Sequence, residues 1–376
     1  MNPEGLNLDN WREPEFNRHS FYHVDDILPV HSIATSGTIP LNRRIDNQTK
    51  FELPESISSL QVFHEKTYGN AMLIAKEGEI IYEWYRDNSL SSQPHILFSV
   101  SKSITAMLAG LFVDRGDLDP DKGIIDYLPA VAGSAYADAT LQQLLDMTIS
   151  MDFEEEYLGK DNQYARYRRA TGWNLRGPDD TEHLAEFLYQ IPRAKHAHGS
   201  KFAYRSPNSD LLGLVIEKTI GESVSRLLSK YLFEPVGAIG PAYINIDGEG
   251  TARTAGGICC TAEDLLRLGE LMRNQGQVNN KQIISEHWVT ECTKKGDREA
   301  WIQGDMALFL PEGRYRNKWY QDGSGTFLGI GIHGQWLYVN PETGVTISKF
   351  SSYPTPMNDE LDLLTLEAFN SMSRAL

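Results

Sequence analysis

The chain has 376 residues, of which 41% are hydrophobic and 23% are charged. This length and composition are typical of a globular protein with a large core, arranged as two domains or as one domain with a large insertion. It contains 35 Lys and Arg residues and 51 Asp and Glu residues, which gives a net charge of −16. Such a chain offers no basic stripe, so we expect neither nucleic acid nor a membrane as a partner.

The start of the chain and its cysteines suggest a cellular location. The first residues, MNPEG, contain no basic region followed by an apolar one, so we expect no export signal and a cytoplasmic location. Cys259 and Cys260 are adjacent and Cys292 stands alone, which fits neither a disulfide framework nor a Cys-x-x-Cys site. His196 and His198 lack an acidic partner at ligand spacing, so we expect no metal.

In chain order, residues 1–55 have no sustained period and are expected to form an N-terminal arm. Two β-rich runs, residues 71–75 and 80–85, flank a turn with Gly78 and predict an antiparallel hairpin. The run 103–113 is apolar or small on every side and too short to cross a bilayer, which predicts a helix buried in a globular core.

The middle of the chain, residues 116–244, is mostly helical by pattern, with helices expected at 141–145, 181–189, 210–219 and 224–233. Strand-like runs return at 328–339 and 345–350, followed by an amphipathic helix from about residue 359 to 373. We therefore predict an α/β fold, an antiparallel sheet flanked by helices. Residues 1–115 and 245–376 would form it, with a helical domain inserted and the active site between the two parts.

The most specific chemical signal is a serine and a lysine at the start of the buried helix. Ser99 falls where β-favouring residues give way to the helix, near the unpaired N–H groups of its first turn. Lys102 lies one turn further on the same face and can reach the serine hydroxyl. A buried lysine that loses its charge can take that proton and make the serine a nucleophile. The alternative is that Ser99 is only a helix cap.

A second candidate for proton handling is Tyr204, in a polar loop before an apolar helix. A tyrosine close to an ammonium group can have its pKa lowered from about 10 toward neutral pH. The alternative is a packing role. The sequence contains no Gly-x-Ser-x-Gly elbow and no glycine-rich dinucleotide or phosphate loop, so we expect no cofactor.

Five blocks of sequence resemble, in the same order, the serine hydrolases related to class C β-lactamases, penicillin-binding DD-peptidases and family VIII carboxylesterases. They are FSVSKS (98–103), LLDMT (144–148), YRS (204–206), FEPVG (233–237) and AGGICCTAEDL (255–265). Three further runs, NRHSFYHV (17–24), DFEEEY (152–157) and GIHGQ (331–335), are most similar to the 6-aminohexanoate-dimer hydrolases, which cleave linear nylon oligomers.

The resemblance implies a role for each matching residue. Ser99 would be acylated, with Lys102 and Tyr204 as proton-handling partners. The backbone N–H of Ser99, with that of Gln335 or of a residue nearby, would form the oxyanion hole. Tyr157 resembles a tyrosine that closes over the amide substrate in the nylon-oligomer enzymes. The substrate-binding surface would consist of Tyr157, Trp319, Ser206, Ile332, His333 and Gly334.

Two departures from the family pattern narrow the function. Ser206 replaces an Asn, and Ile332-His333-Gly334 replaces Lys-Thr-Gly, which removes the cation that would hold a β-lactam carboxylate. Antibiotic or peptidoglycan hydrolysis is therefore not expected.

The leading prediction is an acyl-enzyme hydrolase of a small molecule, acting on 6-aminohexanoate-type linear amides or short acyl esters. The alternatives are a carboxylesterase without useful amidase activity and a non-catalytic binding protein on the same scaffold. A homodimer is left open.

Overall fold

The computed structural model describes residues 3–46, 49–178, 180 and 182–376. Parts of the expected arm (1–2 and 47–48) and the first residue of the helix expected at 181–189 lie outside the described residues.

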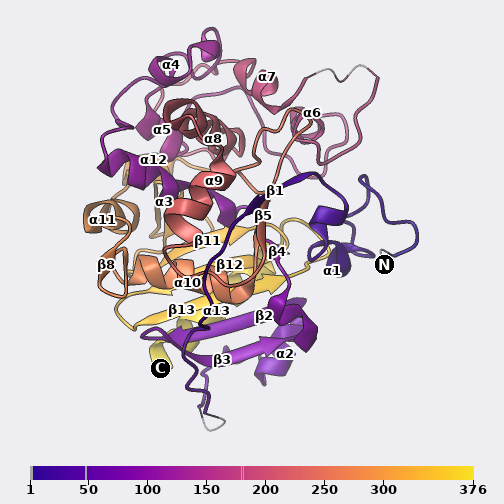
Figure 1. Ribbon diagram of the computed structural model, residues 1–376, viewed down its shortest axis with the longest axis vertical. Helices are drawn as coiled ribbons and strands as arrows, with labels where there is room; N and C mark the ends of the chain where they lie inside the picture. Colours follow the sequence, from indigo (N-terminus) through magenta and orange to yellow (C-terminus); the bar gives the residue numbers. More distant parts are fainter. Residues whose placement is uncertain (1–2, 47–48, 179, 181) are drawn as a thin grey trace.

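In the described part of the chain the strands form three antiparallel sheets (Figure 1). The largest has the order β3-β2-β13-β12-β11-β10-β9, the second has the order β1-β5-β6-β4, and β7 pairs with β8. Their bounds are β1 (Val30–Ile33), β2 (Gly69–Lys76), β3 (Glu79–Tyr85), β4 (His95–Ile96), β5 (Ala242–Asn245), β6 (Ile258–Cys260), β7 (Gln277–Val278), β8 (Lys281–Gln282), β9 (Arg314–Arg316), β10 (Trp319–Gln321), β11 (Phe327–Gly331), β12 (Gln335–Asn340) and β13 (Val345–Ser351).

The helices gather on both sides of the large sheet and in the middle of the chain. Their bounds are α1 (Asn17–Ser20), α2 (Leu60–Lys66), α3 (Val100–Asp114), α4 (Ile124–Tyr127), α5 (Leu141–Leu145), α6 (Gln163–Ala170), α7 (Leu184–Tyr189), α8 (Pro207–Ile220), α9 (Val224–Leu228), α10 (Ala262–Arg273), α11 (Glu286–Lys294), α12 (Arg298–Ile302) and α13 (Asp359–Ala375). Single turns are η1 (Val24–Asp26), η2 (Asn88–Ser92), η3 (Pro129–Val131) and the π-helical η4 (Ser229–Phe233).

The large sheet joins segments from both ends of the chain. The predicted hairpin is confirmed as β2 and β3, and β2 pairs along its length with β13. The structure is an antiparallel sheet flanked by helices, which confirms the predicted fold class. Residues 116–244 contain α4 to α9, while the division into domains at residues 115 and 245 stays a prediction.

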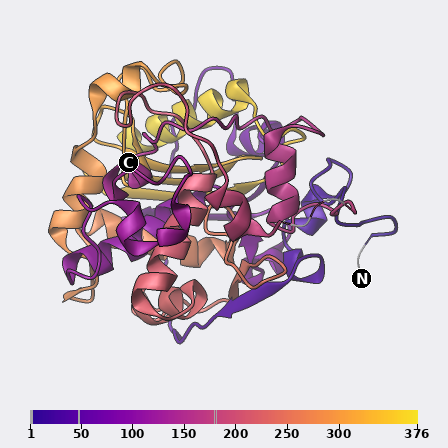
Figure 2. The same ribbon diagram turned by 90° about the horizontal axis from the view of Figure 1, so that it is seen from above.

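Helices cover both faces of the large sheet (Figure 2). Because successive side chains of a strand point to opposite faces, each strand contributes to two cores. On one face, α3 and α10 pack on alternate strand residues that include Leu73, Ala75, Leu337 and Val339. On the other face, Phe369 and Met372 of α13 share a core with Met72, Ile74, Trp336 and Tyr338.

The run expected as one strand at residues 328–339 is two strands. β11 ends at Gly331 and β12 begins at Gln335, and these two residues pair across the hairpin. Between them, His333 and Gly334 have φ angles of 59° and 82°. These left-handed conformations reverse the chain, so the prediction of one continuous strand is wrong here.

The N-terminal arm is built into the fold. β1 pairs with β5, and Trp11 and Phe21 are fully buried. Their rings pack against Phe98, at centroid distances of 6.3 and 4.9 Å. The arm therefore supports the residue that immediately precedes Ser99.

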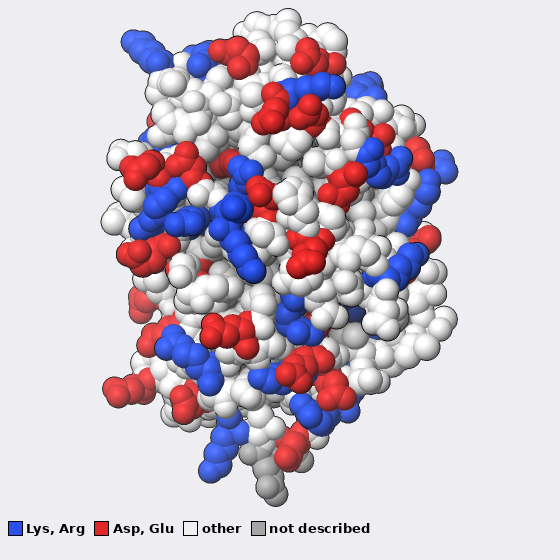
Figure 3. Space-filling view, turned by 90° about the vertical axis from the view of Figure 1, so that its left-hand side faces the viewer, with Lys and Arg blue, Asp and Glu red and all other residues white. Residues whose placement is uncertain are grey.

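Two further observations concern possible partners. On the face in Figure 3, Lys and Arg side chains are interspersed with Asp and Glu side chains, and they form no basic stripe there. None of the helices in the described chain is long and apolar enough to cross a membrane.

Candidate active site

Ser99 lies at the junction of β4 and α3, where the chain turns sharply. It precedes the first residue of α3, Val100, and its own exposure is 9%. The residue before it, Phe98, has a φ of 43°, an uncommon conformation for a residue with a side chain. Rings from the arm and from Trp173 hold Phe98 in place, so the turn presents Ser99 to a cavity.

Lys102 lies one turn into α3 and contacts the serine directly. Its Nζ atom is 2.7 Å from Oγ of Ser99 and 2.7 Å from the carbonyl oxygen of Ala255. The side chain is buried, and burial lowers the pKa of Lys102 to about 7, although the nearby Glu155 carboxylate raises it in part. At neutral pH the amine is therefore uncharged in an appreciable fraction of molecules.

A buried polar network fixes the carbonyl that Lys102 contacts. Asp210 of α8 accepts a hydrogen bond of 2.7 Å from the backbone N–H of Ala255, and it forms an ion pair with Arg253. Tyr167 of α6 donates its hydroxyl to the same carboxylate. Since these groups are buried and bonded to one another, they hold the Ala255 carbonyl rigidly against Lys102.

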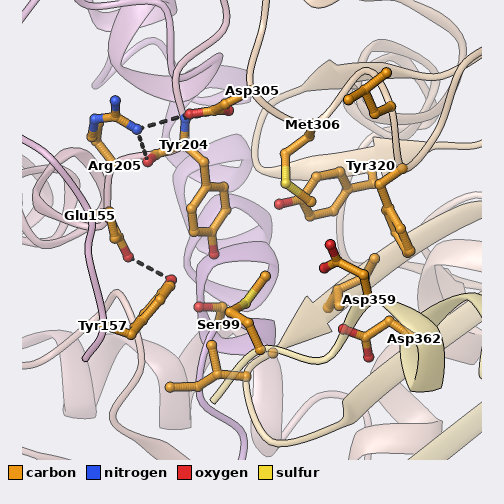
Figure 4. A pocket seen from close by; sticks show the side chains of 16 residues that line it. Ser99, Glu155, Tyr157, Tyr204, Arg205, Asp305, Met306, Tyr320, Asp359 and Asp362 are labelled. Atoms are coloured by element: carbon orange, nitrogen blue, oxygen red, sulfur yellow. Dashed lines mark hydrogen bonds and ion pairs between the residues drawn. The ribbon is translucent and has the colours of Figure 1, made fainter. Parts of the chain in front are cut away.

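Tyr204 completes the group around Ser99. Its ring centroid is 4.9 Å from Nζ of Lys102, and its hydroxyl points toward Ser99 (Figure 4). The loop is held by Asp305, which accepts the backbone N–H of Tyr204 and forms an ion pair of 2.9 Å with Arg205. The structure thus brings Tyr204, which is distant in sequence, to the pair formed by Ser99 and Lys102.

The expected direction of the Tyr204 pKa is wrong. Burial raises the pKa of Tyr204 well above its usual value, and the Glu155 carboxylate raises it further, while the Ser99 side chain opposes them. Lys102 is the group whose pKa burial brings near neutrality. The sequence could not indicate this, because the depth of each side chain depends on segments distant in the chain.

The cavity beside Ser99 has a volume of about 370 Å³. It is lined by aromatic, aliphatic and acidic side chains from several elements (Figure 4). The lining residues are Ser99, Glu155, Tyr157, Tyr204, Arg205, Asp305, Met306, Leu308, Phe309, Tyr320, Ile330, Gly331, Ile332, Met357, Asp359 and Asp362. Tyr157 lines it as expected.

Glu155 is a site residue that the sequence analysis missed. Its carboxylate accepts the hydroxyl of Tyr157 at 2.9 Å and both the backbone N–H and the hydroxyl of Ser206. Ser206 therefore lies behind Glu155 and is not among the residues that line the cavity. The sequence could have indicated Glu155, because in an extended segment alternate side chains point to opposite sides. Glu154 and Glu156 are exposed, whereas Glu155 points inward on the same side as Tyr157.

The turn after β11 departs from several expectations. Of the three residues Ile332, His333 and Gly334, only Ile332 lines the cavity at Ser99. His333 is buried and its Nδ1 lies 2.8 Å from the carbonyl oxygen of Tyr353, and Gly334 packs against the Tyr353 ring. Gln335 begins the next strand and is not among the residues that line the cavity, and its side chain donates to carbonyl groups of the turn.

Gly331 lies against the backbone of Ser99. A Cβ atom added there would be 2.7 Å from the carbonyl oxygen of Leu97 and 3.0 Å from the backbone nitrogen of Ser99. Only glycine allows this approach. The last two residues of β11, Ile330 and Gly331, and the following Ile332 therefore form the edge of the cavity beside Ser99, and which backbone N–H of this turn completes the oxyanion hole stays a prediction.

Trp319 does not line the cavity, contrary to expectation. It is fully buried and packs against Phe327 with ring centroids 5.3 Å apart. The next residue of β10, Tyr320, faces the cavity instead. Neighbouring residues of a strand point to opposite faces, so a shift of one residue reverses the assignment.

Two acidic side chains, Asp359 and Asp362, lie on the side of the cavity away from Tyr157 (Figure 4). Both come from the first turns of α13, whereas the carboxylate of Asp305 is paired with Arg205 beside Tyr204. Burial raises the pKa of Asp362 to about 7. Among the described residues, no group of three His, Cys, Asp or Glu side chains could hold a metal ion.

Both a protein-family model and a known relative match most of the chain. A family model described as Beta-lactamase matches residues 58–369. The 6-aminohexanoate-dimer hydrolase of Paenarthrobacter ureafaciens is 32% identical over 378 residues, which cover 98% of this chain and 94% of that protein.

Two solved structures have the same fold. One is a Bacillus anthracis protein assigned to the 6-aminohexanoate-dimer hydrolases, with a TM-score of 0.89, 22% identity and coverage of 98% of this chain and 97% of that chain. The other is a family VIII carboxylesterase, with a TM-score of 0.60, 15% identity and coverage of 87% and 99%. Because the match to the family extends from α2 into α13, the chain belongs to the beta-lactamase family and is a hydrolase of the beta-lactamase fold.

Proposed function

We propose that the protein cleaves linear amides of the 6-aminohexanoate type, or short acyl esters, through an acyl-enzyme on Ser99. The observation that carries this proposal is the contact of 2.7 Å between Nζ of Lys102 and Oγ of Ser99. A neutral amine in that position can accept the serine proton, and burial brings the pKa of Lys102 to about 7.

The reaction would proceed in two steps. Oγ of Ser99 attacks the substrate carbonyl carbon while its proton passes to Lys102, and the oxyanion faces the backbone N–H groups of Ser99 and Ile332. Tyr204 remains protonated because its pKa is raised, so it can accept a proton from Lys102 while donating its own to the leaving group. The bond between the carbonyl carbon and the leaving nitrogen or oxygen breaks as the leaving group takes this proton. Water then attacks the acyl carbon and gives up a proton to the Lys102–Tyr204 pair, the bond to Oγ breaks, and that proton returns to Oγ of Ser99 as the acid product leaves.

The lining of the cavity suits a substrate with an aliphatic chain that ends in a positive charge. Asp359 and Asp362 line the side away from Tyr157, and Met306, Leu308 and Ile330 supply apolar surface. A 6-aminohexanoyl group has an aliphatic chain that ends in an ammonium group, which matches apolar walls and a carboxylate end. The relative from Paenarthrobacter ureafaciens, named for 6-aminohexanoate dimer, agrees with this choice.

A carboxylesterase without useful amidase activity is the second candidate. The observation in its favour is the fold shared with the family VIII carboxylesterase. An ester leaving group departs more easily than an amine, which must also be protonated, so the same site can cleave esters without cleaving amides well.

Mass spectrometry of the intact protein after fluorophosphonate treatment tests the nucleophile, with Ser99→Ala as the control. We expect one adduct on the unmutated protein and none on Ser99→Ala. Hydrolysis of the 6-aminohexanoate dimer then separates the two candidates. An unlabelled protein that also fails to cleave p-nitrophenyl acetate would overturn the proposal and favour a non-catalytic binding protein.

A further inference from the structure

A second cavity, of about 700 Å³, adjoins the one at Ser99. Tyr157 and Ile332 line both cavities and so form the boundary between them. The N-terminal arm, α6 and the turn after β11 surround the second cavity. A linear substrate whose scissile bond lies at Ser99 can therefore extend past Tyr157 into it.

The charge of this second cavity is opposite to that of the first. Four cationic side chains line it, Arg12, Lys160, Arg168 and Arg169, against two carboxylates, Asp9 and Glu13. Arg169 forms an ion pair with Asp180. In a chain with a net charge of −16, a cavity with excess positive charge requires a physical explanation.

Arg12 is held in place without a carboxylate in contact. Its guanidinium lies 5.0 Å from the centre of the Trp11 ring, and one nitrogen donates to the side-chain oxygen of Asn174 at 2.7 Å. Its Nη1 atom is shielded from solvent and has no hydrogen-bond partner among the described residues. Burial and the nearby Arg168 lower the pKa of Arg12 to about 10, and the exposed Glu13 offsets this only in part.

Arg168 is the second cation. It donates to the backbone carbonyls of Tyr157 and Gly159 at 3.3 and 3.0 Å, while its Nε has no partner within the described chain. The described residues contain no ion pair of either Arg12 or Arg168 with a carboxylate. Two neighbouring guanidinium groups repel each other, and an anion bound between them would offset that repulsion.

We propose that the second cavity binds the carboxylate end of the leaving half of a linear substrate, with Arg12 as the main contact and Arg168 beside it. This rests on the proposed function, because a linear 6-aminohexanoate amide carries an ammonium group on its acyl half and a carboxylate on its leaving half. The first cavity has the acidic end and the second has the basic one. A guanidinium binds a carboxylate in planar, charge-assisted hydrogen bonds, which suits the unpartnered Nη1 of Arg12.

The experiment uses two acetate esters that differ only at the far end of the leaving alcohol: 6-acetoxyhexanoate, which carries a carboxylate, and hexyl acetate, which does not. The quantity measured is the ratio of their kcat/KM values in the pH-stat. In Arg12→Gln this ratio should fall roughly 10- to 150-fold, the worth of charged hydrogen bonds, mainly through KM. Arg12→Lys should recover part of the ratio.

Arg226→Gln is the matched control, since it removes the same charge from an exposed residue of α9 that lines neither cavity. An unchanged ratio in a folded Arg12→Gln protein, or an equal fall in Arg226→Gln, would overturn the proposal. If Arg12→Gln does not fold, Arg12→Lys and Arg168→Gln are compared in the same way, and a ratio unchanged in both would overturn it.

A binding measurement separates this inference from the proposed function. Calorimetric titration of the Ser99→Ala protein with 6-acetamidohexanoate and with N-hexylacetamide needs no turnover. We expect the carboxylate compound to bind more tightly, and the difference to disappear when Arg12→Gln is added. If neither ester is cleaved but this difference is present, the proposed function fails and the carboxylate site stands. Equal binding of the two compounds would overturn the site.

Discussion

Nζ of Lys102 lies 2.7 Å from Oγ of Ser99 inside a buried helix that supplies no carboxylate partner to the lysine. Desolvation is the main reason why the pKa of Lys102 falls to about 7. A protonated lysine can only donate to the hydroxyl, whereas a neutral one can accept its proton. The protonation state of Lys102 should therefore control the nucleophile, and the predictions below depend on it.

Ser99→Ala and Lys102→Ala should each abolish turnover of p-nitrophenyl acetate while the protein remains folded. Removing both should cost about as much as removing either, because groups that act as one unit are not additive. Turnover is measured by absorbance and folding by circular dichroism. Ser91→Ala, at an exposed position, is the control and should behave as the unmutated protein. Normal turnover by a folded Ser99→Ala protein would rule out the acyl-enzyme.

The pH dependence of kcat/KM for p-nitrophenyl acetate should rise with pH and level off above an inflection near 7. The sign follows from the lysine, since the neutral amine is the active form and its fraction increases as pH passes through the pKa of about 7. The profile is measured between pH 5 and 9, where the pKa of Tyr204, raised by burial, lies out of range.

Tyr204→Phe distinguishes the two possible bases. It should lower the rate but keep the inflection near pH 7, because Lys102 remains. Loss of the inflection in this variant would identify Tyr204, not Lys102, as the titrating group.

Tyr157→Phe should reduce hydrolysis of the 6-aminohexanoate dimer relative to p-nitrophenyl acetate. The Tyr157 hydroxyl, now bonded to Glu155 at 2.9 Å, can contact the N–H of an amide, a group that esters lack. The loss should correspond to one hydrogen bond made in the transition state, about 1–3 kcal/mol or roughly 5- to 150-fold. Equal losses on amide and ester would indicate a packing role for Tyr157 and favour the esterase assignment.

Nitrocefin should be hydrolysed slowly or not at all. The turn after β11 has Ile332-His333-Gly334 where β-lactamases have a lysine, and Asp359 and Asp362 make the cavity less favourable for a carboxylate. The rate is compared with that of p-nitrophenyl acetate under the same conditions. Comparable rates on the two substrates would mean that this turn has been misinterpreted.

Gly331→Ala should sharply reduce turnover, because its Cβ would lie 2.7 Å from the carbonyl oxygen of Leu97 and would push β11 away from Ser99. Gly329→Ala, in the same strand, is the control, since its Cβ would meet side-chain atoms of Ser103 and Val100 at 3.2 Å. We expect kcat to fall much more for Gly331→Ala. Similar activities of the two variants would argue against the approach of Ile332 to the oxyanion.

Much of the fold and the centre of the site followed from the sequence alone. The hairpin of β2 and β3 follows from two β-rich runs around a glycine turn, the buried helix α3 from a continuous apolar run, and the final helix α13 from its amphipathic period. These signals are local and do not depend on distant segments. Ser99 and Lys102 are three residues apart in one helix, so helical geometry alone places them together. The family resemblance added Tyr204, which the structure brings to the same cavity.

Only the tertiary structure decided which residues complete the site. Tyr320 lines the cavity in place of Trp319 because strand register assigns alternate side chains to opposite faces, and a turn at His333 leaves Ile332, but not His333, Gly334 or Gln335, among the residues that line it. The pKa of Lys102 and that of Tyr204 depend on burial by several distant segments. The carboxylate of Glu155 and the guanidinium of Arg12 reach their cavities only when separate parts of the chain pack together, which no local pattern encodes.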